Sequence, residues 1–164
     1  MKDDIKQLDD IIRHIQLVQE NCIILGKRLM DEGEAFLGRM LIHNGFQHDV
    51  SKFLGSEWEH MKFVDVKKLN KEQKICLKLA ISDHNQSNEH HPEFWGSIKF
   101  MPDVYVAEMV CDWKSRSTEF GTSLEDWINE EATKRFEFDK NDEVYKKIMK
   151  FVDLLCKPPF TEVK

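Results

Sequence analysis

Apolar residues recur at steps of three and four along most of this chain, the spacing that places them on one face of an α-helix. Between residues 4 and 30 this stripe consists of Leu8, Ile11, Ile15, Val18, Cys22, Leu25 and Leu29. No segment shows a convincing alternation of apolar and polar residues, which would be the pattern of a half-buried β-strand. The chain is therefore expected to be all-α.

Capping patterns and helix breakers predict where the other helices lie. Asn70 and Gln73 occupy the N-cap and N3 positions of a capping box, which predicts a helix to about residue 84. A second box, Thr122 to Glu125, predicts a helix to about residue 136, and Pro102 suits the first turn of the helix between them. Further helices are expected over residues 35–42 and about 141–156. Residues 85–101 form a predicted loop, and a loop that long is uncommon in a compact domain unless it is functional.

The length of the chain allows one core, and its charge narrows the possible partners. The 164 residues contain no linker and no repeat, so we expect a single domain over residues 1–164, a bundle of about six or seven helices. The net charge of -6 argues against a protein that binds bulk nucleic acid through its phosphates. The N-terminal MKDDIKQLDD has no apolar signal core, and no stretch approaches the roughly 18 apolar residues of a membrane span. A cytoplasmic protein without a membrane partner is the expectation.

Histidines and aspartates carry the strongest hint of chemistry. His48 and Asp49 are adjacent, and Lys52 follows about one helical turn later, where it could place a cation beside a bound anion. The other candidate ligands lie on or next to separate predicted helices, and the full set is His14, His48, Asp49, His84, His90, His91 and Asp112. Imidazole and carboxylate ligands suit Zn, Fe, Mn, Co or Ni, and seven are more than one ion normally needs. An alternative for Asp112 is a helical ion pair with Arg116 at i+4.

These residues form three motifs that resemble a known superfamily. His14, then His48-Asp49, then Asp112, spread over separate helices, resembles the HD superfamily of metal-dependent phosphohydrolases, and HDVSK is similar to its His-Asp-x-x-Lys motif. A closer resemblance is to a family of small HD-like proteins of unknown function from bacteria and phages, with the motifs HD-x-SKF-x-x-x-E, H-x-x-x-N-x-HH and MP-x-x-Y-x-x-EM-x-x-DW. Here these motifs span His48 to Glu57, His84 to His91 and Met101 to Trp113. The resemblance covers roughly residues 14 to 130.

The resemblance implies a metal site but no substrate. It makes His14, His48, Asp49 and Asp112 the ligands of a first ion. It also makes Asp49 a bridge to a second ion, held by His84 with His90, His91 or both. Glu57 and Asn88 match the family pattern and are candidate general acid or base groups, or groups that support the ligands. A Gly-Tyr-Pro segment is missing after the paired histidines, so a cyclic-di-GMP phosphodiesterase is not indicated.

The leading hypothesis is a metal-dependent phosphohydrolase that cleaves a small phosphate ester or nucleotide with water activated by one or two divalent transition metal ions. Asp49, Lys52 and Glu57 would carry the catalysis, and Lys52, Asn88 and Arg116 would bind the substrate. Two alternatives stay open. The same ligands could hold a di-iron oxygenase centre, or the chain could be a non-enzymatic module that binds a metal or nucleotide.

Overall fold

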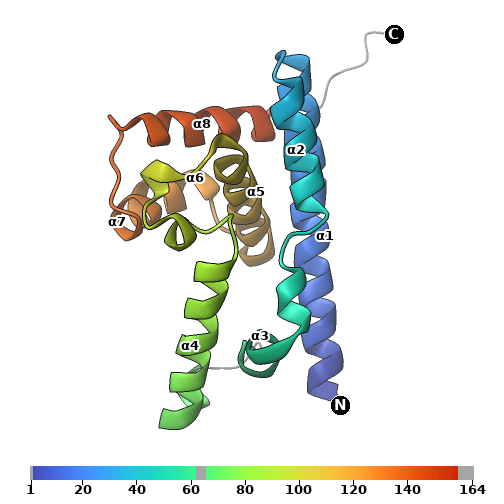
Figure 1. The fold of residues 1–164 in the computed structure, drawn as a ribbon, viewed down its shortest axis with the longest axis vertical. Helices are drawn as coiled ribbons and strands as arrows, with labels where there is room; N and C mark the ends of the chain where they lie inside the picture. The colour runs from blue at the N-terminus through green and yellow to red at the C-terminus, as the bar shows by residue number, and fades with distance from the viewer. Residues whose placement is uncertain (1, 62–65, 159–164) are drawn as a thin grey trace.

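The computed structural model describes residues 2–61 and 66–158, and all regular secondary structure among them is helical (Figure 1). Residues 1, 62–65 and 159–164 of the predicted domain lie outside the described residues. The α-helices are α1 (Lys2–Asp31), α2 (Ala35–Gly45), α3 (Gly55–His60), α4 (Lys71–Ser87), α5 (Asp103–Phe120), α6 (Leu124–Trp127), α7 (Thr133–Arg135) and α8 (Glu143–Cys156). A π-helical turn, η5 (Ile128–Ala132), makes α6 and α7 one continuous helix. The described residues therefore form seven helices, which confirms the predicted all-α bundle.

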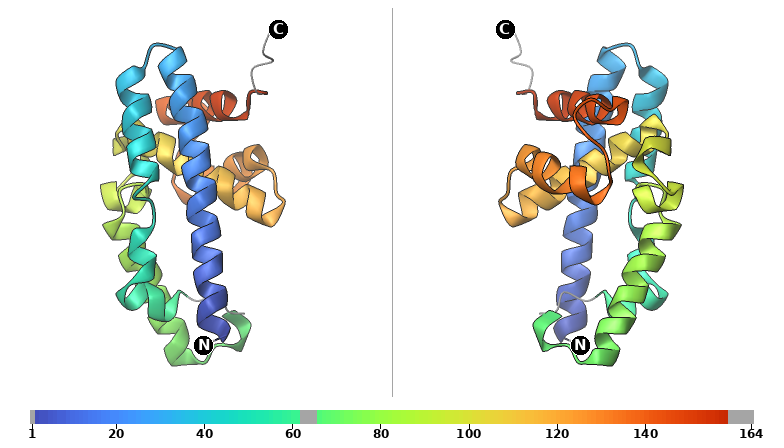
Figure 2. Two further views of the ribbon diagram at one scale, coloured as in Figure 1. Left: turned by 90° about the vertical axis from the view of Figure 1, so that its right-hand side faces the viewer. Right: turned by 90° about the vertical axis from the view of Figure 1, so that its left-hand side faces the viewer.

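The pairing of α1 with α2 depends on two glycines. The two helices run antiparallel along the C-terminal half of α1 (Figure 2). A Cβ added to Gly26 would lie 2.7 Å from the carbonyl oxygen of Gly38, and one added to Gly38 would lie 2.7 Å from the Met30 side chain. Because neither position has room for a side chain, the two backbones can approach closely. This contact fixes the direction of α2, which leads directly to His48 and Asp49.

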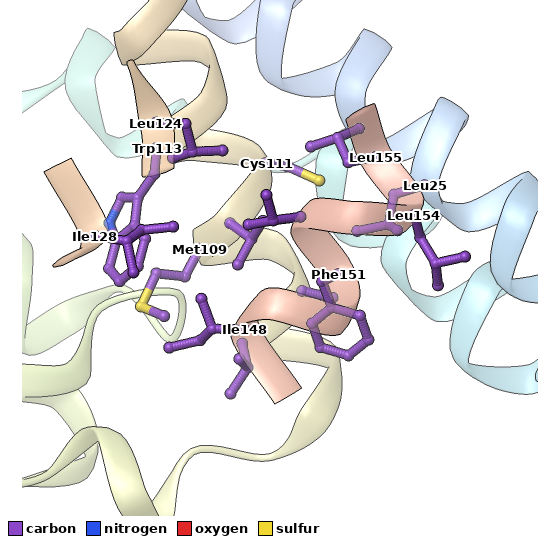
Figure 3. Packing of buried hydrophobic residues seen from close by; sticks show 14 of the residues in the cluster. Leu25, Met109, Cys111, Trp113, Leu124, Ile128, Ile148, Phe151, Leu154 and Leu155 are labelled. Carbon is purple, nitrogen blue, oxygen red and sulfur yellow. The ribbon is translucent and has the colours of Figure 1, made fainter. Parts of the chain in front are cut away.

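The core lies where α8 crosses α1 and α5. The predicted stripe of α1 supplies Val18, Cys22, Leu25 and Leu29, all fully buried. Figure 3 shows α8 contributing Ile148 and Phe151 next to Met109 of α5. Helix α5 is buried over most of its length, because it also packs against α1, α2 and α6. It therefore forms a rigid support for the residues that it presents.

The two predicted capping boxes have different outcomes. The Asn70 side chain accepts from the Gln73 backbone N–H, and the Gln73 side chain accepts from the Asn70 N–H, which confirms the first box. The second prediction is wrong by one residue, because the N-cap of α6 is Ser123, whose hydroxyl accepts from the Asp126 N–H. The Thr122 N–H donates instead to the Ser117 carbonyl, which completes the end of α5 after the left-handed Gly121.

The predicted loop is shorter and more ordered than expected. Helix α4 continues to Ser87, and two 3₁₀ turns, η3 (Pro92–Trp95) and η4 (Ile98–Phe100), follow it. In Figure 1, α4 and α1 occupy opposite sides of the molecule, with α3 near their lower ends. Over residues 2–61 and 66–158, no helix combines the length and the apolar character needed to cross a membrane.

Candidate metal centre

Four separate segments carry the seven candidate ligands. His14 lies in α1, and Asp112 lies in the middle of α5. His48 and Asp49 form the turn between α2 and the 3₁₀ helix η1 (Val50–Phe53). His84 lies in the last turn of α4, and His90 with His91 follows in the connection to η3. The structure brings all seven side chains together, and three overlapping groups of them have ligand atoms within 4.8 Å of one another.

The His-Asp pair lies in a turn and not on a continuous helix. Asp49 has a left-handed backbone with φ of 58°, and its carbonyl then accepts from the Lys52 N–H in η1. On a continuous helix, neighbouring side chains would diverge by about 100°. Asp and Asn are among the few non-glycine residues that readily adopt this conformation. The turn lets both side chains face the same point.

The Asp49 carboxylate lies at the centre of the cluster and is almost fully buried. Its Oδ2 atom lies 3.3 Å from His14 Nε2 and 3.4 Å from His48 Nε2. Its Oδ1 atom lies 3.3 Å from His84 Nε2 and 3.5 Å from His90 Nε2. Each carboxylate oxygen therefore faces its own pair of imidazoles.

Asp112 and His91 complete the two sides of this arrangement. Asp112 Oδ1 lies 3.1 Å from His14 Nε2, on the Oδ2 side of Asp49. The His91 ring contacts the rings of His84 and His90, with centroids 4.8 Å and 4.2 Å away. The ligand atoms of His84, His90 and His91 form one of the compact groups.

Several of the inward-facing polar atoms are buried without a hydrogen-bond partner of good geometry among the described residues. They are the Nε2 atoms of His14, His48, His90 and His91 and the Oδ1 atoms of Asp49 and Asp112. A buried polar group without a partner costs about 1–3 kcal/mol, so six together are costly unless something binds them. Lone pairs on nitrogen and carboxylate oxygen, without a thiolate, suit the divalent ions Mn, Fe, Co, Ni and Zn. The described residues thus fit one or more metal ions.

A second ring of carboxylates orients the imidazoles from outside. His48 Nδ1 lies 3.0 Å from Glu108 Oε1, and His84 Nδ1 lies 2.6 Å from Glu57 Oε2. His14 Nδ1 lies 3.3 Å from Glu119 Oε1, within ion-pair distance but without hydrogen-bond geometry. At His48 and His84, such a carboxylate accepts the Nδ1–H of a neutral imidazole and leaves the Nε2 lone pair free to bind a metal.

Two of these outer carboxylates were not predicted from the sequence. Glu108 is four residues before Asp112, and Glu119 is seven after it, so all three lie on one face of α5. The signal that could have revealed them is a row of acidic residues at helical spacing in a segment rich in apolar residues. Glu57 was predicted, and the structure places it against His84 as well as beside the first of the cavities described below.

The candidate substrate-binding residues lie in different surroundings. The Lys52 ammonium pairs with Asp49 Oδ2, and its side chain is largely buried. Arg116 Nη1 pairs with Glu119 Oε2 at 3.1 Å, so the alternative ion pair with Asp112 is not the one formed. Asn88 is the C-cap residue of α4 and donates through Nδ2 to the His84 carbonyl at 2.8 Å.

Burial and the neighbouring charges divide the five imidazoles into two classes, one with raised and one with lowered pKa values. Burial alone would lower the pKa of His14 and His48, but nearby carboxylates outweigh it and raise these pKa values to about 9 and about 10. For His14 the carboxylates are mainly those of Asp112 and Asp49, and for His48 mainly that of Asp49. Burial dominates at the other three imidazoles, with pKa values lowered to about 4 for His84 and about 3 for His90 and His91.

The two aspartates are held ionised. Burial would raise their pKa values, but the charges of His48 and Lys52 hold the pKa of Asp49 well below its usual range. The neighbouring His14 does the same for Asp112. The metal-free cluster therefore has two charged carboxylates, two protonated imidazoles and three neutral ones near neutral pH.

Three cavities border the cluster. The first, about 250 Å³, lies beside His14, and the second, about 380 Å³, lies beside His84, His91 and Asp112. Lys52 and Arg116 line both of these cavities. The third, about 120 Å³, lies beside His48, His90 and Glu108. A small molecule in either of the two larger cavities would lie next to both the candidate ligands and these cations.

Comparison with known proteins gives a family but no activity. The sequence model of a family described as "Family of unknown function (DUF5662)" matches residues 3–157. No curated protein and no solved structure matches the chain. Because the match extends over nearly all of the chain, the chain belongs to this family.

Proposed function

We propose that this member of a family of unknown function is a metal-dependent phosphohydrolase that cleaves a small phosphate ester. The observation that carries the proposal is the orientation of Asp49, whose two oxygens face separate pairs of imidazoles. A carboxylate placed in this way can bridge two ions, and paired ions are a common arrangement in phosphoester hydrolysis. The order of His14, His48-Asp49 and Asp112 along the chain, which resembles the HD superfamily, supports the same reading.

The resemblance to the HD superfamily implies two positions for ions among these ligands. His14, His48, Asp49 and Asp112 would hold the first, and Asp49, His84 and His90 or His91 would hold the second. Ions bound there would lower the pKa of a coordinated water and polarise a phosphoryl oxygen. The imidazoles of the second position are neutral near neutral pH, because burial keeps the pKa values of His84 and His90 low. Their Nε2 atoms can therefore bind a metal without first losing a proton.

Residues of the chain itself bind and orient the substrate. Lys52 and Arg116 place two cations at the edge of the cavities, where they would attract the phosphate and offset the charge that develops on its oxygens. Glu57 Oε2 accepts hydrogen bonds from His84 Nδ1 and from the Ser51 hydroxyl. We therefore assign Glu57 a positioning role, in which it keeps the Nδ1 proton of His84 and directs Nε2 inward.

The test combines metal analysis with a hydrolysis screen. We expect the purified protein to carry about two transition metal ions and to release phosphate or alcohol from a panel of phosphomonoesters and phosphodiesters in Mn²⁺. Asp49→Asn should lose most of the metal and reduce turnover about a hundredfold or more. The matched control is Asp83→Asn. Asp83 is exposed and directly precedes His84 in the sequence, so this variant should keep both its metal and its turnover.

Two outcomes would contradict the proposal. Metal-loaded protein that turns over no ester in the panel would exclude hydrolysis. If the inactive metal-loaded protein holds iron and consumes oxygen with a candidate substrate, the oxygenase alternative replaces the phosphohydrolase proposal.

A further inference from the structure

The two larger cavities both border the candidate metal centre. They share a wall made by Lys52, Met61, Arg116 and Phe120. His14 faces the first cavity, whereas His84, His91 and Asp112 face the second. A phosphate bound at the centre would therefore have a cavity on each of two sides.

The second cavity has an aromatic wall. Trp113 and Trp127 meet edge to face with centroids 4.6 Å apart, and Trp113 stacks on Phe136 at 5.9 Å. Arg135 lies 4.8 Å above the Phe136 ring. Packed aromatic rings give a preformed surface for a planar or apolar group, and the arginine adds a cation at its edge.

The first cavity has an apolar side, several charged side chains, among them Asp10 and Arg13, and one fixed polar group. Ile11, Met61 and Phe120 supply the apolar surface. Gln7 is 4% exposed and donates through Nε2 to the Trp58 carbonyl at 2.7 Å. Its Oε1 is buried without a hydrogen-bond partner among the described residues, so an acceptor is left for a ligand that fills this cavity.

Both cavities are large enough for an organic group of their own. A cavity of roughly 150 Å³ accommodates benzene. The first cavity, at about 250 Å³, and the second, at about 380 Å³, both exceed that size. A phosphomonoester with one small organic group would fill one cavity and leave the other without a ligand.

From this arrangement we propose that the substrate is a phosphodiester with an organic group on each side of the phosphorus, one in each cavity. The proposal rests on the proposed function for the position of the phosphate. It adds that Ile11 and its neighbours recognise one arm, and that the wall of Trp113, Trp127 and Phe136 recognises the other. Hydrolysis would break one P–O bond, with the water oxygen joining phosphorus and the leaving alkoxide or aryloxide taking up a proton.

The first test measures binding and does not depend on turnover. Titration calorimetry on the Mn²⁺-loaded protein compares diphenyl phosphate, which has two arms, with phenylphosphonate, which has one and cannot be hydrolysed as an ester. Ile11→Trp should fill the first cavity, so we expect diphenyl phosphate to bind at least about tenfold more weakly and phenylphosphonate to stay within about twofold. The matched control is Ile12→Trp, at a neighbouring position on α1 that is 38% exposed and does not line the cavity.

Ile11→Phe is the second variant, because it adds less volume and keeps the test valid if Ile11→Trp does not fold. It should also weaken the binding of diphenyl phosphate. Equal losses for both ligands, or no loss for either in a folded variant, would overturn the two-arm proposal. So would failure of diphenyl phosphate to bind the unmodified protein.

A second test separates this proposal from the proposed function. Bis(p-nitrophenyl) phosphate should be cleaved with a higher kcat/KM than p-nitrophenyl phosphate, and Ile11→Trp should reduce this preference. Binding of diphenyl phosphate that depends on Ile11, without cleavage of either ester, would support the two-arm site and contradict hydrolysis. If the protein instead cleaves p-nitrophenyl phosphate in preference to the diester, and Ile11→Trp does not change this preference, the result would support hydrolysis and contradict the two-arm site.

Discussion

Loading the cluster with metal should release protons, because the metal-free protein holds two of its imidazoles in the charged form. A metal ion binds only the neutral form at the nitrogen that it uses, so a protonated ligand must lose its proton first. The pKa values of His14 and His48 are raised to about 9 and about 10 by the carboxylates around them, which outweigh the effect of burial. Those of His84, His90 and His91 are lowered, so these three contribute no proton at neutral pH.

The number of protons follows from these pKa values. At pH 8, His14 would be about nine-tenths protonated and His48 almost completely protonated, so full loading should release about two protons. Five histidines with the ordinary pKa of about 6.5 would together release less than about 0.2 at the same pH. A coordinated water that ionises would add to the release, so about two is the lower bound.

The assay is titration calorimetry with Mn²⁺ in two buffers that differ in ionisation enthalpy. The dependence of the observed heat on buffer gives the number of protons released. The raised pKa values fix the direction of the pH dependence. Protons compete with the metal, so metal affinity should rise with pH. The number of protons released from His14 and His48 should fall as the pH passes through about 9 to 10. A release below about one proton at pH 8, with metal bound at full occupancy, would refute this reasoning.

Two further predictions concern a carboxylate beside the centre and the contact between α1 and α2. Glu108→Gln removes the charge that faces the Nδ1 atoms of His48 and His90, and it should weaken metal binding by about 10–100-fold, measured by calorimetry. The exposed control Glu59→Gln should have no effect. Gly38→Ala should lower the free energy of unfolding in urea by about 1–3 kcal/mol, because its methyl group would meet the Gly26 backbone and the Met30 side chain. Met40→Ala, a half-exposed position on the same helix, should change it by less than about 0.5 kcal/mol, and an equal loss in both variants would contradict the close-contact argument.

Periodicity predicted the parts of the fold that depend on burial. The stripe from Leu8 to Leu29 marks a real helix, and from Val18 onward its residues are buried in the core, whereas Leu8 at its start is exposed. The cap at Ser123 could not be placed as easily, since Thr122-Glu125 and Ser123-Asp126 both fit the spacing. The choice was decided by the end of α5, where the backbone after Gly121 already uses the Thr122 N–H.

The candidate site was predictable to the extent that it consists of unusual residues. His48-Asp49 and the paired His90-His91 are conspicuous in a sequence, and the structure brings them together with the other three candidate ligands, His14, His84 and Asp112. Glu108 and Glu119 are not conspicuous, because an acidic residue on a helix is usually exposed and solvated. Only the packing of α5 shows that they face imidazoles.

The left-handed turn at Asp49 also limits which residues can replace it. With φ at 58°, the backbone favours glycine, asparagine or aspartate, and of these only aspartate supplies a carboxylate. A glutamate would keep the charge but would strain the turn. Under the proposed function, a relative that keeps the fold without a metal site should therefore have asparagine or glycine at the position of Asp49. That single position would then separate members of the family that can bind metal there from members that cannot.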